Sequence, residues 1–204
     1  MKAMTIVYTV GDGLYINLTN RCTNSCDFCI RNNGDGAYGS DSLWLEREPT
    51  VDEVLAAVRE EDPARFSEIV FCGYGEPSVR LFDAVKIAEE IKDEYPWVSI
   101  RMNTNGHSDL IHGNNTAEAY SGVFDTVSIS LNTPNAEKYC EICHPVYGKA
   151  AFDALLTFAK NVKNYVQNVC FSVVRETLTD GELAACEAIA REAGVTLKVR
   201  TLIK

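Results

Sequence analysis

The sequence predicts an α/β fold, a partial (β/α)6 TIM-type barrel of parallel strands, for three reasons. Short β-branched runs alternate with helical patterns along the chain. Strand, helix and strand in repetition imply parallel strands joined by right-handed crossovers. The 204 residues hold about six such units, whereas a full eight-unit barrel typically needs roughly 250. We therefore expect one domain over 1–204, with no C-terminal extension.

The strands are expected where apolar, β-branched residues form short runs. Six runs have this character, and they cover residues 14–18, 68–72, 98–103, 125–131, 169–174 and 196–203.

Helices are expected between these runs. Thr50 and Glu53 form a capping-box pattern ahead of one helix. Thr179 and Glu182 repeat this pattern before another, which Gly194 is suited to end. The other helical segments are 81–91, 151–162 and, more weakly, 115–120.

Charge and hydropathy exclude several classes of protein. The net charge is −10 and no stretch gathers Lys and Arg, which argues against nucleic-acid binding. The N-terminus lacks a signal-peptide pattern, and no run approaches the roughly 18 apolar residues of a membrane span. We therefore predict a cytoplasmic protein whose eight cysteines stay reduced and serve metal binding or catalysis.

Three cysteines follow the first predicted strand directly. Cys22, Cys26 and Cys29 thus lie where reactive groups collect in parallel sheets, beyond the carboxyl ends of the strands. Three soft thiolates suit an iron-sulfur cluster or zinc. Structural zinc prefers four ligands, and no fourth Cys or His follows nearby. A four-iron cluster held by three thiolates would instead keep one iron open for a further ligand.

The spacing C-x3-C-x2-C, with Phe28 before the last cysteine, resembles the signature of the radical S-adenosylmethionine (SAM) superfamily. The runs NLTNRCTNSCDFCIRNN and FCGYGEP and the CHP loop are most similar to the small TatD-associated radical SAM proteins. The resemblance implies a [4Fe-4S] cluster on the three cysteines, with SAM on the open iron. It also implies a 5′-deoxyadenosyl radical that abstracts hydrogen from a substrate, and an electron donor such as flavodoxin or ferredoxin.

The same resemblance implies SAM contacts from later strand ends. GYGEP, after the second strand, is similar to the glycine-rich motif that binds the SAM amino group. The fourth run is polar on one face, which indicates a lined cavity because helix-covered parallel strands are apolar on both faces. Arg175 could pair with the SAM carboxylate, or it could equally be a charge at the rim. Many members of the family carry glycines near this strand that let the adenine pass, and this sequence has none there. The expected cofactor contacts are Phe28, Gly73, Tyr74, Gly75, Glu76, Asn103, Asn105, Ser128, Ser130, Asn132, Ser172 and Arg175.

The remaining cysteines leave alternatives open. Cys140, Cys143 and His144 match a haem-attachment pattern, which the missing export signal disfavours, and this loop could instead lie near the cluster. Cys72, Cys170 and Cys186 are expected to act as small buried apolar residues. A zinc-binding interaction module with Cys72 as a distant fourth ligand and an iron-sulfur electron-transfer protein are the rival hypotheses.

Shielding of the radical sets a further expectation. The chain ends right after the sixth strand, so an open-sided barrel needs something else to exclude water. The candidates are the Gly- and Asp-bearing loop 31–48, a second copy in a homodimer, or a bulky substrate such as a protein or peptide. The loop could also be a plain solvated connection.

Overall fold

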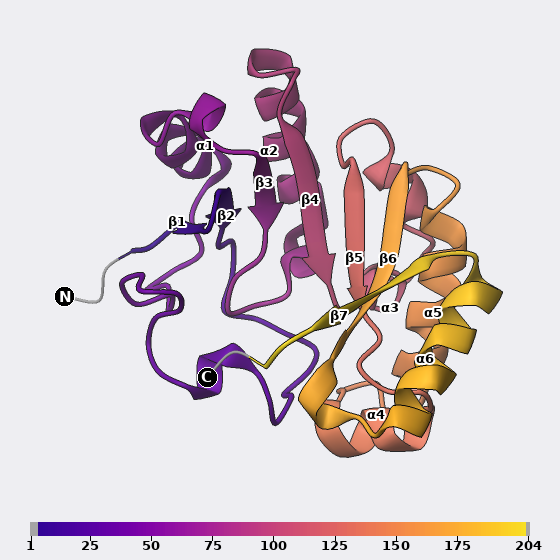
Figure 1. The fold of residues 1–204 in the computed structure, drawn as a ribbon. Coiled ribbons are helices and arrows are strands. Elements are labelled where there is room, and N and C mark those ends of the chain that lie inside the picture. The colour runs from indigo at the N-terminus through magenta and orange to yellow at the C-terminus, as the bar shows by residue number, and fades with distance from the viewer. Residues whose placement is uncertain (1–3, 203–204) are drawn as a thin grey trace.

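A seven-stranded sheet forms the centre of the protein in the computed structural model, which describes residues 4–202 (Figure 1). The strands lie side by side in chain order, and all neighbours from β2 onward pair in parallel. The sheet does not close on itself. The parallel strands are β2 (Gly13–Ile16), β3 (Glu68–Phe71), β4 (Ser99–Thr104), β5 (Thr126–Ser130), β6 (Asn168–Val174) and β7 (Thr196–Arg200). The predicted partial barrel of six parallel strands is confirmed.

One strand was not expected from the sequence. β1 (Val7–Val10) pairs antiparallel with β2 through a tight turn. Gly11 takes φ +61° in this turn, a left-handed conformation that suits glycine. The Gly-Asp-Gly turn between two apolar runs is the hairpin signal in the sequence.

The two capping-box helices form as predicted. α1 (Val51–Glu60) begins after Thr50, whose side chain accepts from the Glu53 N–H, and the Glu53 carboxylate accepts from the Thr50 N–H in return. α6 (Asp180–Ala193) repeats this box and ends at Gly194, which has φ +72°. The predicted helices at 81–91 and 151–162 are α2 (Leu81–Glu94) and α5 (Ala150–Val162).

Two short helices escaped prediction, and several single turns complete the fold. α3 (Ser108–His112) and α4 (Ala136–Cys143) follow β4 and β5. α4 buries only Tyr139 and Cys143, four residues apart, so its apolar pattern is too short to read. The weak helix expected at 115–120 is a 3-10 turn. The 3-10 turns are η1 (Ile30–Asn32), η2 (Pro63–Arg65), η3 (Pro77–Arg80), η4 (Ala117–Tyr120) and η5 (Arg175–Thr177).

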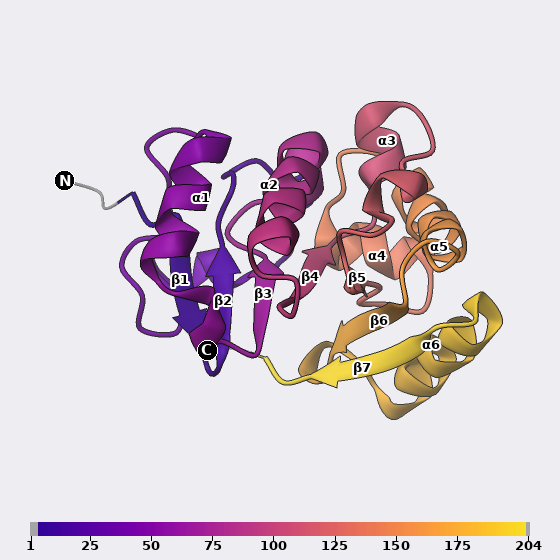
Figure 2. The same ribbon diagram turned by 90° about the horizontal axis from the view of Figure 1, so that it is seen from above.

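The sheet curves, and its two faces differ in character. Seen from above, the strands follow an arc with α1, α2 and α5 on its outer side (Figure 2). Side chains alternate between faces along each strand. The outward side chains of β2 to β5 are fully buried and apolar, and they are Leu14, Ile16, Ile69, Phe71, Ile100, Met102, Val127 and Ile129. The inward positions carry polar residues such as Arg101, Asn103 and Ser128, as expected for a lined cavity.

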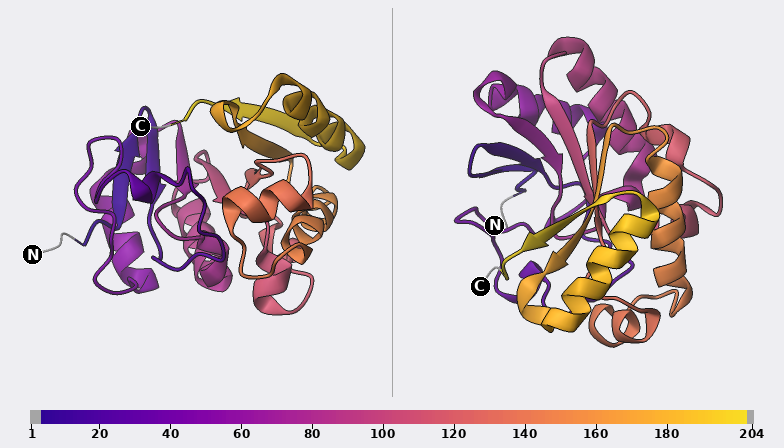
Figure 3. Two further views of the ribbon diagram at one scale, coloured as in Figure 1. Left: turned by 90° about the horizontal axis from the view of Figure 1, so that it is seen from below. Right: turned by 45° about the vertical axis from the view of Figure 1, so that its right-hand side comes forward.

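The carboxyl ends of the strands share one edge of the sheet. In Figure 1 strands β3 to β5 point downward, and the segment after β2 and helix α4 lie below their ends. The two views of Figure 3 show the same segment and α4 at this edge. No helix within residues 4–202 is long and apolar enough to cross a membrane.

Candidate functional site

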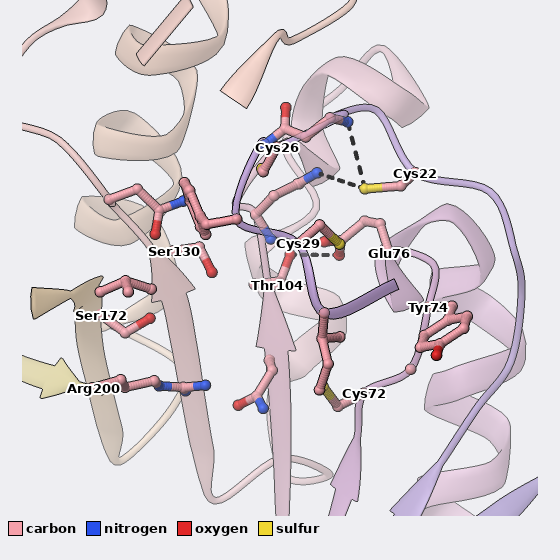
Figure 4. Close-up of a pocket in the computed structure, with 18 of the residues that line it drawn as sticks. Cys22, Cys26, Cys29, Cys72, Tyr74, Glu76, Thr104, Ser130, Ser172 and Arg200 are labelled. Carbon is pink, nitrogen blue, oxygen red and sulfur yellow. Dashed lines mark hydrogen bonds between the residues drawn. The ribbon is translucent and has the colours of Figure 1, made fainter. Parts of the chain in front are cut away.

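A cavity of about 230 Å³ lies at the carboxyl edge of the sheet (Figure 4). The three cysteines of the C-x3-C-x2-C segment, the end of β3 and the inward side chains of β4 to β7 all line it. Every residue predicted from the sequence to bind the cofactor lines this cavity, except Ser128 and Arg175. Residues from positions 22 to 202 therefore converge on one space.

The cysteine segment is held against helix α4. The Ser25 N–H donates to the Cys143 carbonyl at 2.9 Å, and the Asp27 N–H donates to the Ile142 carbonyl at 3.0 Å. The His144 imidazole lies 2.8 Å from the Asp27 carboxylate. The prediction that the Cys143–Pro145 loop lies near the three cysteines is confirmed.

A buried histidine anchors the same segment from the other side. His107 Nδ1 lies 2.9 Å from Thr23 Oγ1, and its Nε2 lies 3.1 Å from the Tyr139 hydroxyl. Asn105 Nδ2 donates to Thr23 Oγ1 at 2.8 Å, and Asn24 Nδ2 donates to the Tyr139 hydroxyl at 2.9 Å. Burial lowers the pKa of His107 to about 4, so the ring is neutral at pH 7. Nothing in the sequence marked His107 for this role.

The three thiols are protonated in the cofactor-free protein. Burial raises the pKa of Cys22 to about 12, and the nearby Glu76 carboxylate adds to this effect. The pKa of Cys26 is raised first by its hydrogen bond with Cys143 and then by burial, and burial raises the pKa of Cys29. Metal binding at these thiols would therefore release protons.

Two glycines let the cysteine segment approach the end of β3. A Cβ atom on Gly75 would lie 2.2 Å from the Thr19 carbonyl oxygen, and one on Gly73 would lie 2.2 Å from Asn17 Oδ1. The sequence alone suggests that these glycines admit a ligand to the backbone. The structure shows that the chain itself makes the close approach, so packing of the segment after β2 already requires both glycines.

Glu76 joins the ends of β3 and β4. Its buried carboxylate accepts from Thr104 Oγ1 at 2.6 Å, from the Asn105 N–H at 2.7 Å and from the Ser78 N–H at 3.0 Å. Burial raises the pKa of this carboxyl, while the three donors act against that rise. Glu76 also lines the cavity.

The polar residues of β5 and β6 divide into two levels. Ser130 and Ser172 are paired in register, and both line the cavity together with Asn132. Ser128 lies one inward position deeper along β5 and is 1% exposed. It accepts a hydrogen bond from Arg200 Nη2 at 2.9 Å and does not line the cavity.

Arg200 lines the cavity, whereas Arg175, which was predicted to contact the cofactor, does not. The Arg175 guanidinium donates to the Leu178 carbonyl at 2.8 Å and pairs with Asp180 outside the cavity. Arg200, at the end of β7, lines the cavity instead. The alternation in TLKVRTLI puts Lys198 and Arg200 on one face, and this is the signal that could have identified Arg200 from the sequence.

The other cysteines are placed by three different elements. Cys72 follows β3 and lines the cavity, so its expected role as a small core residue is wrong. Cys170 is half-buried in β6, and Cys186 is fully buried in α6. Cys72 follows β3 directly, and the alternation that turns Ile69 and Phe71 outward turns the Cys72 side chain inward.

The donor set fits a multi-iron cluster better than a single ion. Within residues 4–202, no three His, Cys, Asp or Glu side chains are arranged to hold one metal ion, which structural zinc would require. Three soft thiols around one cavity are instead the ligands that iron-sulfur clusters use. Cys22, Cys26 and Cys29 would hold such a cluster.

A curved, open parallel sheet with a three-cysteine segment at its carboxyl edge defines a class of metal-cluster barrels. The model of the radical SAM superfamily matches residues 16–189, so the chain belongs to the radical SAM superfamily. The members of this superfamily are enzymes, and they use a [4Fe-4S] cluster, SAM and a reductant. The predicted superfamily and cofactors are confirmed, whereas the TatD-associated subgroup stays a prediction.

Curated relatives and solved structures agree with this placement. A 5-amino-6-(D-ribitylamino)uracil--L-tyrosine 4-hydroxyphenyl transferase of Methanosarcina barkeri is 32% identical over 57% of this chain and 29% of its own length. A GTP 3′,8-cyclase of Clostridium perfringens is 26% identical over 92% of this chain and 54% of its own length. The chain thus spans only part of these relatives.

The similar solved structures establish the fold alone. HydG, a maturase of the [FeFe]-hydrogenase, superposes with a TM-score of 0.67 at 18% identity, over 93% of this chain and 42% of that one. Streptococcus suis SuiB, bound to its precursor peptide SuiA, superposes with a TM-score of 0.65 at 16% identity, over 96% and 40% of the two chains.

Proposed function

We propose that Cys22, Cys26 and Cys29 hold a [4Fe-4S] cluster and that the protein cleaves SAM reductively to start a radical reaction on a substrate. The observation that carries this proposal is the convergence of three half-buried thiols and the polar ends of five strands, β3 to β7, on one cavity. The cluster supplies the electron for SAM cleavage and the 5′-deoxyadenosyl radical that abstracts hydrogen. The protein supplies binding, orientation and exclusion of water.

The residues around the cavity divide these tasks. Glu76 and the Gly73–Gly75 backbone line the cavity side by side, and we place the SAM ammonium group against them. Asn105 offers an amide group, and Ser130 and Ser172 offer hydroxyl groups, to the ribose and the carboxylate of SAM. Phe28, Tyr74, Asn103 and Asn132 complete the proposed wall.

The loop 31–48 packs beside the site and lines a smaller cavity next to it. Tyr74 donates its hydroxyl proton to the Gly34 carbonyl at 2.8 Å, and Asn17 Nδ2 donates to the Leu43 carbonyl at 2.8 Å. Ala37 and Leu43 are buried in a small apolar cluster of their own. These contacts favour a functional role for the loop over a plain solvated connection.

The partners of the reaction are also part of the proposal. We propose that a flavodoxin- or ferredoxin-type protein supplies the electron and that the reaction takes place in the cytoplasm. A protein or peptide substrate, or a second copy of the chain, would cover the open side between β1 and β7. Light scattering with and without SAM checks the homodimer directly.

SAM cleavage is the decisive test. After anaerobic reconstitution with iron and sulfide, the reduced protein should convert SAM to 5′-deoxyadenosine and methionine, as measured by mass spectrometry. Cys22→Ala, Cys26→Ala and Cys29→Ala should each abolish the product. Cys140→Ala is the matched control, because Cys140 lies in α4 and does not line the cavity. A full cluster that never cleaves SAM would contradict the proposal.

A further inference from the structure

A second cavity of about 160 Å³ adjoins the cofactor cavity beneath loop 31–48. We call it the tyrosine annexe. The two cavities share wall residues, among them Cys72, Tyr74, Asn103 and Arg200. A molecule in the annexe would therefore lie directly beside the bound cofactor.

Four aromatic side chains line the annexe, beside the apolar side chains of Ile30, Ala37 and Leu43. The four tyrosines are Tyr8, Tyr15, Tyr38 and Tyr74. The Tyr8 hydroxyl donates to the Cys72 carbonyl at 3.2 Å, and the Tyr74 hydroxyl donates to the Gly34 carbonyl at 2.8 Å. Because these hydroxyls are engaged by the chain itself, the rings chiefly offer aromatic carbon to the space. Aromatic walls favour planar aromatic guests.

The volume of the annexe suits one ring. A buried cavity of about 150 Å³ lined by apolar side chains is large enough to bind benzene. The annexe has about the same volume, so it accommodates one planar six-membered ring with its substituents extending toward the shared wall.

Two polar atoms at the shared wall lack hydrogen-bond partners among residues 4–202. Arg200 Nε and Asn103 Oδ1 are buried and make no hydrogen bond. Arg200 donates through Nη2 to Ser128, and no carboxylate of residues 4–202 lies within ion-pairing distance of it. A buried polar atom without a hydrogen-bond partner is unfavourable. A ligand that brings a negatively charged or carbonyl acceptor to Arg200 and a donor to Asn103 would satisfy both atoms.

Arg200 lies away from the end of the cavity at which the cysteines gather. Its partner Ser128 is one inward position deeper than Ser130. Figure 4 shows the guanidinium below Ser172 and pointing into the cavity, with Cys22 and Cys26 at the opposite end. This position favours a ligand other than the group bound by the thiols.

We propose that the tyrosine annexe binds the hydrogen-donating substrate through one planar ring. The ring carries an anionic or carbonyl acceptor for Arg200 and an N–H or O–H donor for Asn103. The role as substrate rests on the proposed function, but binding of the ring does not. Two kinds of molecule have this chemistry, a heterocycle with an amide edge and a hydroxylated aromatic acid.

The test uses orotate and 4-hydroxybenzoate as probes of these two kinds, with the cofactor-free full chain. Saturation-transfer NMR titrations should show that one or both bind. Dihydroorotate has the same polar groups on a puckered ring and should bind about threefold or more weakly than orotate. Arg200→Met should weaken binding roughly tenfold or more, because a charge-assisted hydrogen bond is lost.

Matched variants guard against a general loss of structure. Arg191→Met changes an exposed arginine of α6 and should bind the probes like the wild type. Asn103→Leu should weaken binding without removing a charge. Circular dichroism melting confirms that each variant is folded. The probe that binds more tightly identifies the kind of ring.

Three results would overturn the inference. Neither probe binds at concentrations up to about 10 mM; Arg200→Met binds as well as Arg191→Met; or planar and puckered rings bind equally. If Arg200→Met loses SAM binding in the reconstituted protein but keeps the probe, Arg200 serves the cofactor and the inference is wrong. Failure of the wild type to cleave SAM would instead refute the proposed function and leave probe binding as measured.

Discussion

His107 should make the stability of the protein fall as the pH drops below 6.5. In the unfolded chain histidine takes up a proton near pH 6.5, whereas burial lowers the pKa of His107 in the folded protein to about 4. Between these values the unfolded state binds more protons than the native state, so stability rises with pH across this window. The contribution is fully present above pH 6.5 and is lost as the pH falls toward 4.

The magnitude follows from the two pKa values. Each factor of ten in proton affinity corresponds to about 1.4 kcal/mol. At pH 5 the unfolded histidine is almost fully protonated and the native one is almost fully neutral. The free energy of unfolding should therefore be about 2 kcal/mol lower at pH 5 than at pH 7 through this residue alone.

Urea unfolding of the cofactor-free chain, followed by circular dichroism, provides the assay. His107→Gln keeps hydrogen-bonding groups near Thr23 and Tyr139 but does not titrate. Its stability deficit relative to the wild type should shrink by about 2 kcal/mol between pH 7 and pH 5. Other groups, including Glu76, titrate in both proteins and cancel in this comparison. Parallel pH profiles for the two proteins would refute the reasoning.

Three further substitutions test the site. Gly75→Ala should lower the free energy of unfolding by about 1–3 kcal/mol and reduce iron uptake, because its Cβ would overlap the Thr19 carbonyl. Gly181→Ala is the control, since no atom lies within 4 Å of its Cβ. It should change neither the melts nor the iron assays. Glu76→Gln should lower the free energy of unfolding by about 1–3 kcal/mol, because its amide nitrogen would face a hydrogen-bond donor. It should also weaken SAM binding, measured by equilibrium dialysis. Unchanged stability and unchanged SAM binding would exclude the proposed role of Glu76. Arg175→Ala should bind SAM like the wild type, and its free energy of unfolding should fall by less than about 1 kcal/mol, because only a surface ion pair is removed. A large loss of SAM affinity would show that Arg175 belongs to the site.

Local patterns predicted most of the fold and the centre of the site. The capping boxes at Thr50 and Thr179 predicted where α1 and α6 begin, because a cap depends on residues only three positions apart. The spacing of Cys22, Cys26 and Cys29 predicted that the three thiols share one cavity, and their role as cluster ligands stays a prediction. Alternation along the run 125–131 predicted that Ser128, Ser130 and Asn132 face a cavity, and the structure places Ser130 and Asn132 there but not Ser128.

Contacts between distant segments were beyond such patterns. Arg200 rather than Arg175 lines the cavity. The reason is that β6 ends before Arg175, where η5 begins, whereas Arg200 still belongs to β7. The requirement for Gly73 depends on Asn17, which follows β2 and is distant in the sequence. His107 acquires its role only where α4 brings Tyr139 beside it.

The sequence by itself determined where the parallel strands and the capped helices form and where the three closely spaced cysteines lie, since each is encoded within a short stretch of chain. Only the tertiary structure decided how the ends of β3 and β4 are joined through Glu76, which arginine enters the cavity, and that loop 31–48 encloses an annexe. The physical reason is that hydrogen bonding and burial act between atoms in space, and parallel strands bring together residues that are more than a hundred positions apart along the chain.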